Sequence, residues 1–126
     1  MALSLITIVL LAGCTQATQQ PTVTKPSGQT FTIAIDKTGF TPGQLGIKAG
    51  DTVVFTNRDT SPHWSASNPH PIHNGYPEKG GCIESTFDAC KPLAQGEQFK
   101  FTFLYTGTWC YHDHLNPSLT GCITVQ

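Results

Sequence analysis

The stretch Phe31-Thr32-Ile33-Ala34-Ile35-Asp36 places its large apolar side chains at every second position. This period of two is typical of a β-strand with one buried face, because successive side chains of a strand point to opposite faces. Residues 45–47 repeat the pattern, and the turn pair Gly50-Asp51 leads into a β-branched run over residues 52–56. Alternating phenylalanines then predict another strand within residues 99–104.

Two further strands are predicted over residues 107–112 and 122–125, joined by a polar loop that contains Asn116-Pro117. Turn signals separate all these runs, and none of them shows the period of an amphipathic helix. The pattern therefore predicts an all-β sandwich. Residues 57–96 are the exception, because they are long and rich in Pro, Gly, Asn and His. A long loop on a rigid sandwich is where we expect a functional site.

The composition narrows the class of protein. The chain has 126 residues, which is enough for one domain, and only 12% of them are charged. Seven Lys and Arg against eight Asp and Glu give a net charge of −1, so the chain lacks the basic excess of a nucleic-acid binder. Twelve Gly and nine Pro disfavour long helices. Five Cys and five His in so short a chain direct attention to disulfides and metal binding.

The N-terminal segment indicates export. Residues 1–13 are almost wholly apolar but too short to span a bilayer, so they fit a signal peptide, with a first β-strand as the alternative. Leu11-Ala12-Gly13-Cys14 resembles the lipobox of bacterial-type lipoproteins, although no Lys or Arg precedes it. This resemblance implies an acylated Cys14 and a membrane anchor at the cell surface or in the periplasm. Residues 14–28 are then a polar, flexible tether, and residues 29–126 form the domain.

Two separated motifs resemble the cupredoxins, the blue-copper family that includes plastocyanin and azurin. Residues 47–59 followed by Pro62-His63 are similar to the family's strand and loop that deliver a first copper-binding histidine. Residues 107–112 and 119–125 are similar to the two arms of its last hairpin. The resemblance covers residues 29–126 and implies a Greek-key, cupredoxin-like β-sandwich.

The ligand set of a blue site does not carry over. The family pattern in the last hairpin is Tyr-x-Cys-x-x-His-x-x-Met-x-Gly, because a blue site needs a thiolate, imidazoles and a weak axial thioether. Aligning the pattern on its Tyr and Gly places Asp113 at the Cys position, Asn116 at the His position and Leu119 at the Met position. Of the four ligands only His63 remains. A shifted frame that uses Cys110 is disfavoured, because three residues along a strand reverse the side of the sheet.

Histidines offer a different site. His112 and His114 are two residues apart at a strand end and project to one side, in a Tyr-His-x-His pattern that also resembles the first domain of multicopper oxidases. Imidazoles suit copper first and zinc second, and a carboxylate beside them serves as a ligand or orients a ring. A purely structural role for these histidines remains the alternative. The predicted metal-binding residues are His63, His70, His73, His112 and His114. Asp113 is predicted to be either a further ligand or a hydrogen-bond acceptor that fixes the tautomer of a histidine.

The four cysteines after Cys14 fit disulfides better than metal, because an exported domain folds where disulfides persist. Four cysteines allow three connectivities, and the sequence alone does not choose among them. The local pairing joins Cys82 to Cys90 and Cys110 to Cys122. It would also occupy the last candidate thiolate.

We therefore expect a lipid-anchored, cupredoxin-like protein that binds copper through histidines. Its expected role is copper handling or support of a redox chain, with a redox or copper-transfer protein as partner. One alternative is a type 1 electron-transfer protein that uses Cys110, and another is a metal-free interaction module. We expect no enzymatic activity, because the sequence shows no Ser-His-Asp spacing and no paired carboxylates in its His-rich loops.

Overall fold

The structure, a computed structural model, describes residues 28–126. The predicted signal peptide and the tether up to residue 27, including Cys14, lie outside the described residues. The strands are β1 (Thr30–Asp36), β2 (Gly39–Thr41), β3 (Gln44–Ile47), β4 (Thr52–Asn57), β5 (Ser65–Ser67), β6 (Gln98–Thr102), β7 (Gly107–Asp113) and β8 (Asn116–Val125). Within this part of the chain, no helix is long and apolar enough to cross a membrane.

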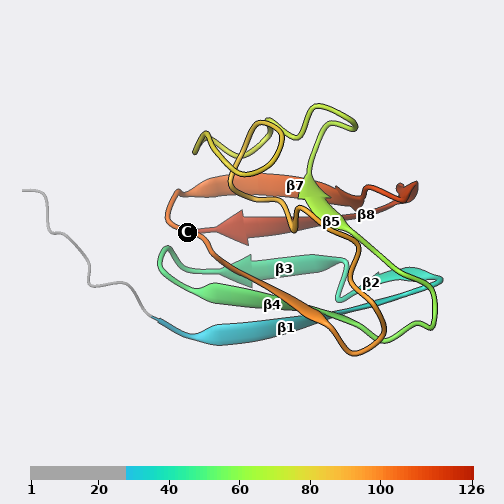
Figure 1. Cartoon of the computed structure of the whole chain (residues 1–126). Helices are drawn as coiled ribbons and strands as arrows, with labels where there is room; N and C mark the ends of the chain where they lie inside the picture. The colour runs from blue at the N-terminus through green and yellow to red at the C-terminus, as the bar shows by residue number, and fades with distance from the viewer. Residues whose placement is uncertain (1–27) are drawn as a thin grey trace, which may run out of the picture.

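The strands form two four-stranded sheets that lie as two layers (Figure 1). One sheet has the order β2-β1-β4-β6, and the other has the order β3-β8-β7-β5. Strands β1 and β4 pair in parallel, as do β3 and β8, because the chain crosses between the layers. The predicted all-β sandwich is confirmed. The chain between β5 and β6, yellow in Figure 1, lies beside β7.

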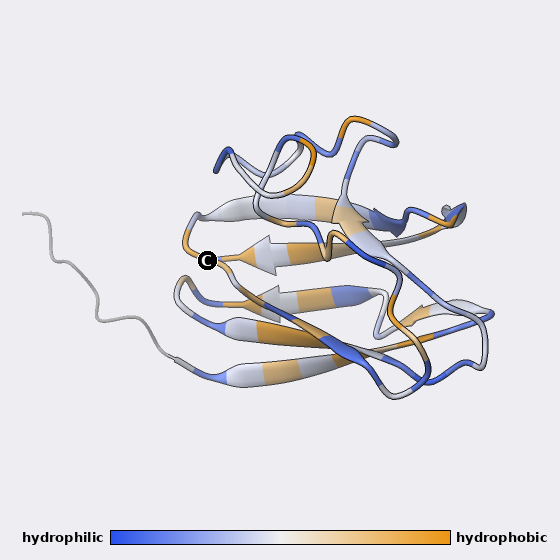
Figure 2. Ribbon diagram, in the orientation of Figure 1, coloured by the Kyte–Doolittle hydropathy of each residue, from blue (hydrophilic) through white to orange (hydrophobic). Residues whose placement is uncertain are grey.

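Aromatic and branched side chains fill the space between the sheets, and the strands of both layers carry apolar bands (Figure 2). Phe55 and Tyr111 come from opposite layers, and their ring centroids lie 5.2 Å apart. Tyr76, Phe87 and Leu93 lie in the long segment 57–96, yet each is at most 2% exposed. Each such side chain contributes roughly 1.5–3 kcal/mol through burial. The segment is therefore held against the sandwich and can position a site.

The end of β7 differs from the prediction. The predicted polar loop around Asn116-Pro117 belongs to β8, and only residues 114–115 separate the two strands. The ladder is irregular here: His112 pairs with Thr120, whereas Asp113 pairs with Asn116. Pro117 is tolerated in β8 because β3 joins this strand only from Cys122 onward.

Both predicted disulfides are present. Cys82 bonds to Cys90, with Cα atoms 5.5 Å apart, and Cys110 bonds to Cys122, with Cα atoms 4.0 Å apart. Cys110 and Cys122 lie directly opposite each other on β7 and β8. All four cysteines of residues 28–126 are thus paired, and Cys110 has no thiolate to offer a metal.

Candidate metal centre

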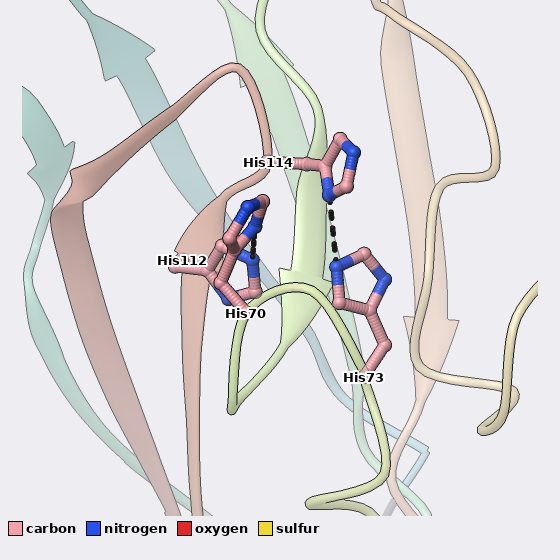
Figure 3. Close-up of side chains that lie close together, drawn as sticks. All are labelled: His70, His73, His112 and His114. Carbon is pink, nitrogen blue, oxygen red and sulfur yellow. Dashed lines mark hydrogen bonds between the residues drawn. The ribbon is translucent and has the colours of Figure 1, made fainter.

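Four of the five histidines meet beside the end of β7. His112 belongs to β7 and His114 to the turn after it, whereas His70 and His73 lie in the chain that follows β5. One ring nitrogen from each of the four lies within 4.8 Å of the others. Figure 3 shows the rings turned toward one another, with hydrogen bonds that join His70 to His112 and His73 to His114. We call these four residues the four-histidine cluster.

Two rings of the four-histidine cluster are oriented by side chains outside it. The Nδ1 of His73 donates to a carboxylate oxygen of Asp88 at 2.6 Å, and the Nδ1 of His112 donates to the amide oxygen of Asn68 at 2.9 Å. An oxygen acceptor at Nδ1 fixes the tautomer, so the Nε2 lone pair of each ring points into the cluster. Both rings are at most 1% exposed.

Asp88 is the central orienting residue, and the sequence did not single it out. Besides His73, its carboxylate accepts hydrogen bonds from the Trp64 indole at 2.6 Å and from the backbone N–H of Cys90 at 2.8 Å. The Trp64 ring in turn lies 4.5 Å from the ring of His114, centroid to centroid. One buried carboxylate therefore links the disulfide loop, the tryptophan and a histidine of the cluster. No local pattern marks Asp88, because its side-chain partners Trp64 and His73 lie 24 and 15 residues away in the sequence.

The remaining two rings complete the cluster. His114 Nδ1 donates to His73 Nε2 at 2.9 Å, and His70 Nδ1 donates to His112 Nε2 at 3.2 Å. His73 also has a φ of 58°, in the left-handed region that non-glycine residues rarely adopt. Such outliers are concentrated at functional sites, where the surrounding contacts hold them. Here those contacts include Asp88 and a backbone hydrogen bond to Pro69.

Packing imidazoles together lowers their proton affinity. Burial, followed by the neighbouring rings of His73 and His70, lowers the pKa of His112 to about 4. Burial and the same two neighbours also lower the pKa of His114. Burial penalises the charged ring, and protonation would also place like charges side by side, so both effects favour the neutral imidazole. A neutral imidazole is the form that binds a metal ion.

His63 lies outside the four-histidine cluster. Its Nδ1 is 2.7 Å from a carboxylate oxygen of Asp113, and its Nε2 is 3.2 Å from one of Asp59. The hydrogen bond from His63 lowers the pKa of Asp59. The five-histidine site expected from the sequence is thus divided into a cluster of four and one histidine between two carboxylates. The hydrogen bonds of the Asp113 carboxylate go to the ring of His63 and to the backbone N–H groups of Trp64 and Leu115.

The residues at the family's copper position do come together, in a cleft of about 260 Å³ lined partly by His63, Asp113, Asn116 and Leu119. They do not fit a blue copper ion, because the set contains no thiolate and no thioether. The Asp113 carboxylate is also occupied by the ring of His63 and by the backbone N–H groups of Trp64 and Leu115. This cleft is therefore not a blue-copper site.

The four-histidine cluster does fit a metal ion. Bonds of about 2.0–2.1 Å to a tetrahedral ion separate ligand nitrogens by about 3.4 Å. The nitrogens of His114 and His73, 2.9 Å apart, and those of His70 and His112, 3.2 Å apart, are close to this spacing, and all four lie within 4.8 Å of one another. Four imidazoles are a donor set for Cu(II) or Zn(II), which agrees with the predicted cofactors. His70 and His114 would release their Nδ1 protons or move them to Nε2, whereas His73 and His112 need no change of tautomer.

The fold and the cluster together define a β-sandwich protein with a candidate imidazole metal site. The family model of the cupredoxin-like domain matches residues 3–125. The chain belongs to this family.

Individual relatives agree with this assignment. Amicyanin from Paracoccus denitrificans is 30% identical over 95 residues, which is 75% of this chain and 63% of amicyanin, so the chain spans less than two thirds of that relative. A purple cupredoxin from Nitrosopumilus maritimus has a structure that aligns with a TM-score of 0.61 at 27% identity, over 75% of this chain and 98% of its own. A Cu(I) structure of an amicyanin mutant aligns with a TM-score of 0.60 at 23% identity, over 77% and 82% of the two chains, which supports the fold.

Proposed function

We propose that this protein is an exported, membrane-anchored cupredoxin that binds one copper ion at the four-histidine cluster. Its role would be copper handling at the cell surface or in the periplasm, or support of a redox chain, rather than catalysis. One observation carries the proposal: four imidazole nitrogens converge, and Asp88 and Asn68 hold two of the rings with their lone pairs turned inward. This is the arrangement in which outer hydrogen bonds fix metal-binding histidines.

Copper is favoured over zinc on two grounds. Sites built from nitrogen bind Cu(II) more tightly than the other divalent ions of the first transition row. In addition, one of the related structures contains Cu(I). Bound copper would supply a cation that accepts one electron. The chain itself orients the rings, keeps His73 and His112 out of water and offers no sulfur ligand within residues 28–126.

A titration with Cu(II) in competition with a chelator tests the proposal, with stoichiometry read by native mass spectrometry. The wild-type domain should bind one Cu(II), and His73→Ala should lose most of its affinity. His63→Gln is the matched control, because it changes the one histidine outside the cluster and keeps an amide that reaches a carboxylate. Circular dichroism checks that both variants fold. Absence of copper on the wild type would favour a metal-free interaction module, and equal losses in both variants would contradict the assignment of the ligands.

A further inference from the structure

The four rings of the cluster are not held equally. His73 and His112 are at most 1% exposed, and each donates to a fixed oxygen acceptor. His114 is half-buried, lies against the Trp64 ring and donates its backbone N–H to the Trp64 carbonyl at 2.6 Å. These three ligands therefore keep their positions with or without an ion.

His70 is the least constrained ring of the four. It is exposed, and the one hydrogen bond of its ring within residues 28–126 goes to another ring of the cluster, at 3.2 Å. The neighbouring residues 69, 71 and 72 are exposed as well. The segment is fixed at its two ends, where the Asn68 backbone bonds to Cys110 and Gly75, and the His73 side chain bonds to Asp88. His70 thus lies on a short exposed loop between two fixed points.

We infer, on the basis of the proposed function, that His70 is the exchangeable ligand through which copper enters and leaves. A copper ion bound to His73, His112 and His114 alone keeps an open coordination position on the solvent side. An acceptor that presents an imidazole takes that position: its nitrogen–copper bond forms as the bond to His70 Nδ1 breaks, and His70 turns toward water. No electron changes hands in this ligand substitution. The partner for which the site is suited is therefore an imidazole-bearing copper acceptor.

The experiment measures transfer of Cu(II) from the loaded protein to a chelator, with and without added imidazole. His70→Ala should still bind one Cu(II), release it roughly tenfold faster or more, and return toward the wild-type rate when imidazole fills the open position. His112→Ala is the matched control. Its cavity is buried, so we expect weaker binding with little rescue at the same imidazole concentration.

The outcomes separate this inference from the proposed function. No copper on the wild type would overturn both. If the wild type binds copper, and His70→Ala and His112→Ala lose copper equally fast and are rescued equally by imidazole, the exchange role alone would be overturned. Electron paramagnetic resonance of the Cu(II)-loaded variants provides a second readout, because imidazole should change the spectrum of His70→Ala and should change that of His112→Ala little at the same concentration.

Discussion

At the end of β7, neighbouring residues serve two different sites. His112 and His114 join the four-histidine cluster, whereas Asp113 between them accepts a hydrogen bond from His63. The Asp113 carboxylate also binds the backbone N–H of Trp64, whose ring contacts His114. The aspartate at the family's cysteine position therefore supports the chain that carries the cluster. The Asp113 carboxylate accepts hydrogen bonds from three donors, the His63 ring and the backbone N–H groups of Trp64 and Leu115.

Asp88→Asn tests the orienting role of this carboxylate. The amide keeps the shape of the side chain but weakens the hydrogen bond that fixes the tautomer of His73. Loss of such an outer partner typically lowers metal affinity by about 10- to 100-fold, and we expect a loss in this range for Cu(II). Competition with a chelator measures it. Glu78→Gln, which changes a carboxylate of the same loop outside the cluster, should leave the affinity unchanged.

Acid should weaken the metal-free fold through His112. Its pKa is about 4 in the folded chain and near 6.5 when unfolded, so the unfolded chain binds the extra proton between these values. The free energy of unfolding should therefore fall as the pH drops from about 6.5 toward about 4. Urea denaturation across this range measures the fall. His112→Gln removes the titrating group and should have a flatter profile, and identical slopes for the two proteins would contradict this explanation.

At the scale of elements, the sequence pattern was sufficient to predict β1, β3, β4, β6, β7 and the second half of β8, but not β2, β5 or the first half of β8. Three residues are too few to show a period, and β5 in addition pairs with β7, which lies far away in the chain. The division of the histidines also escaped prediction. The irregular pairing at His112 and Asp113 sets where these side chains point, and the long-range contacts of Asp88 and Asn68 orient the rings. A single sequence contains no local signal for either effect.

The Cys110–Cys122 disulfide joins β7, which carries His112, to β8, and neither cysteine belongs to the cluster. The bridge spans a sequence separation of 12, for which loop entropy gives about 3 kcal/mol. We expect the double variant Cys110→Ser, Cys122→Ser to lose about this much free energy of unfolding in urea. Its stoichiometry of copper binding should stay at one per chain. A colour change on copper binding that depends on Cys110 would contradict the pairing.

At the scale of the whole molecule, the sandwich is a rigid support, and the four-histidine cluster lies at one end of it. Tyr76 and Phe87 pin the long segment between β5 and β6 into the core, so the rings meet without an ion to gather them. The cleft at the family's copper position and the four-histidine cluster both adjoin the end of β7. Asp113 lines the cleft, whereas its neighbours His112 and His114 belong to the cluster. The fold is thus that of a cupredoxin, while the proposed metal position is displaced from the family's own.

The anchoring of the protein stays a prediction, because Cys14 lies outside the described residues. An acylated Cys14 with the several chains of a bacterial lipoprotein would hold the protein firmly on a membrane. We expect the native protein to sediment with membranes, and Cys14→Ser to release it or to block its processing. Fractionation followed by mass spectrometry of the N-terminal peptide measures both. A native protein cleaved elsewhere and without acyl chains would rule out the anchor.

The most direct test of the account is the spectrum of the Cu(II)-loaded wild-type domain. Copper held only by imidazoles lacks the thiolate-to-copper charge transfer that colours cupredoxins, so the protein should be pale. Its electron paramagnetic resonance should show a wide copper hyperfine splitting with structure from several nitrogens, and His63→Gln should leave both spectra unchanged. An intense band in the visible spectrum, lost in Cys110→Ser, would contradict the four-histidine assignment and restore a blue-copper site.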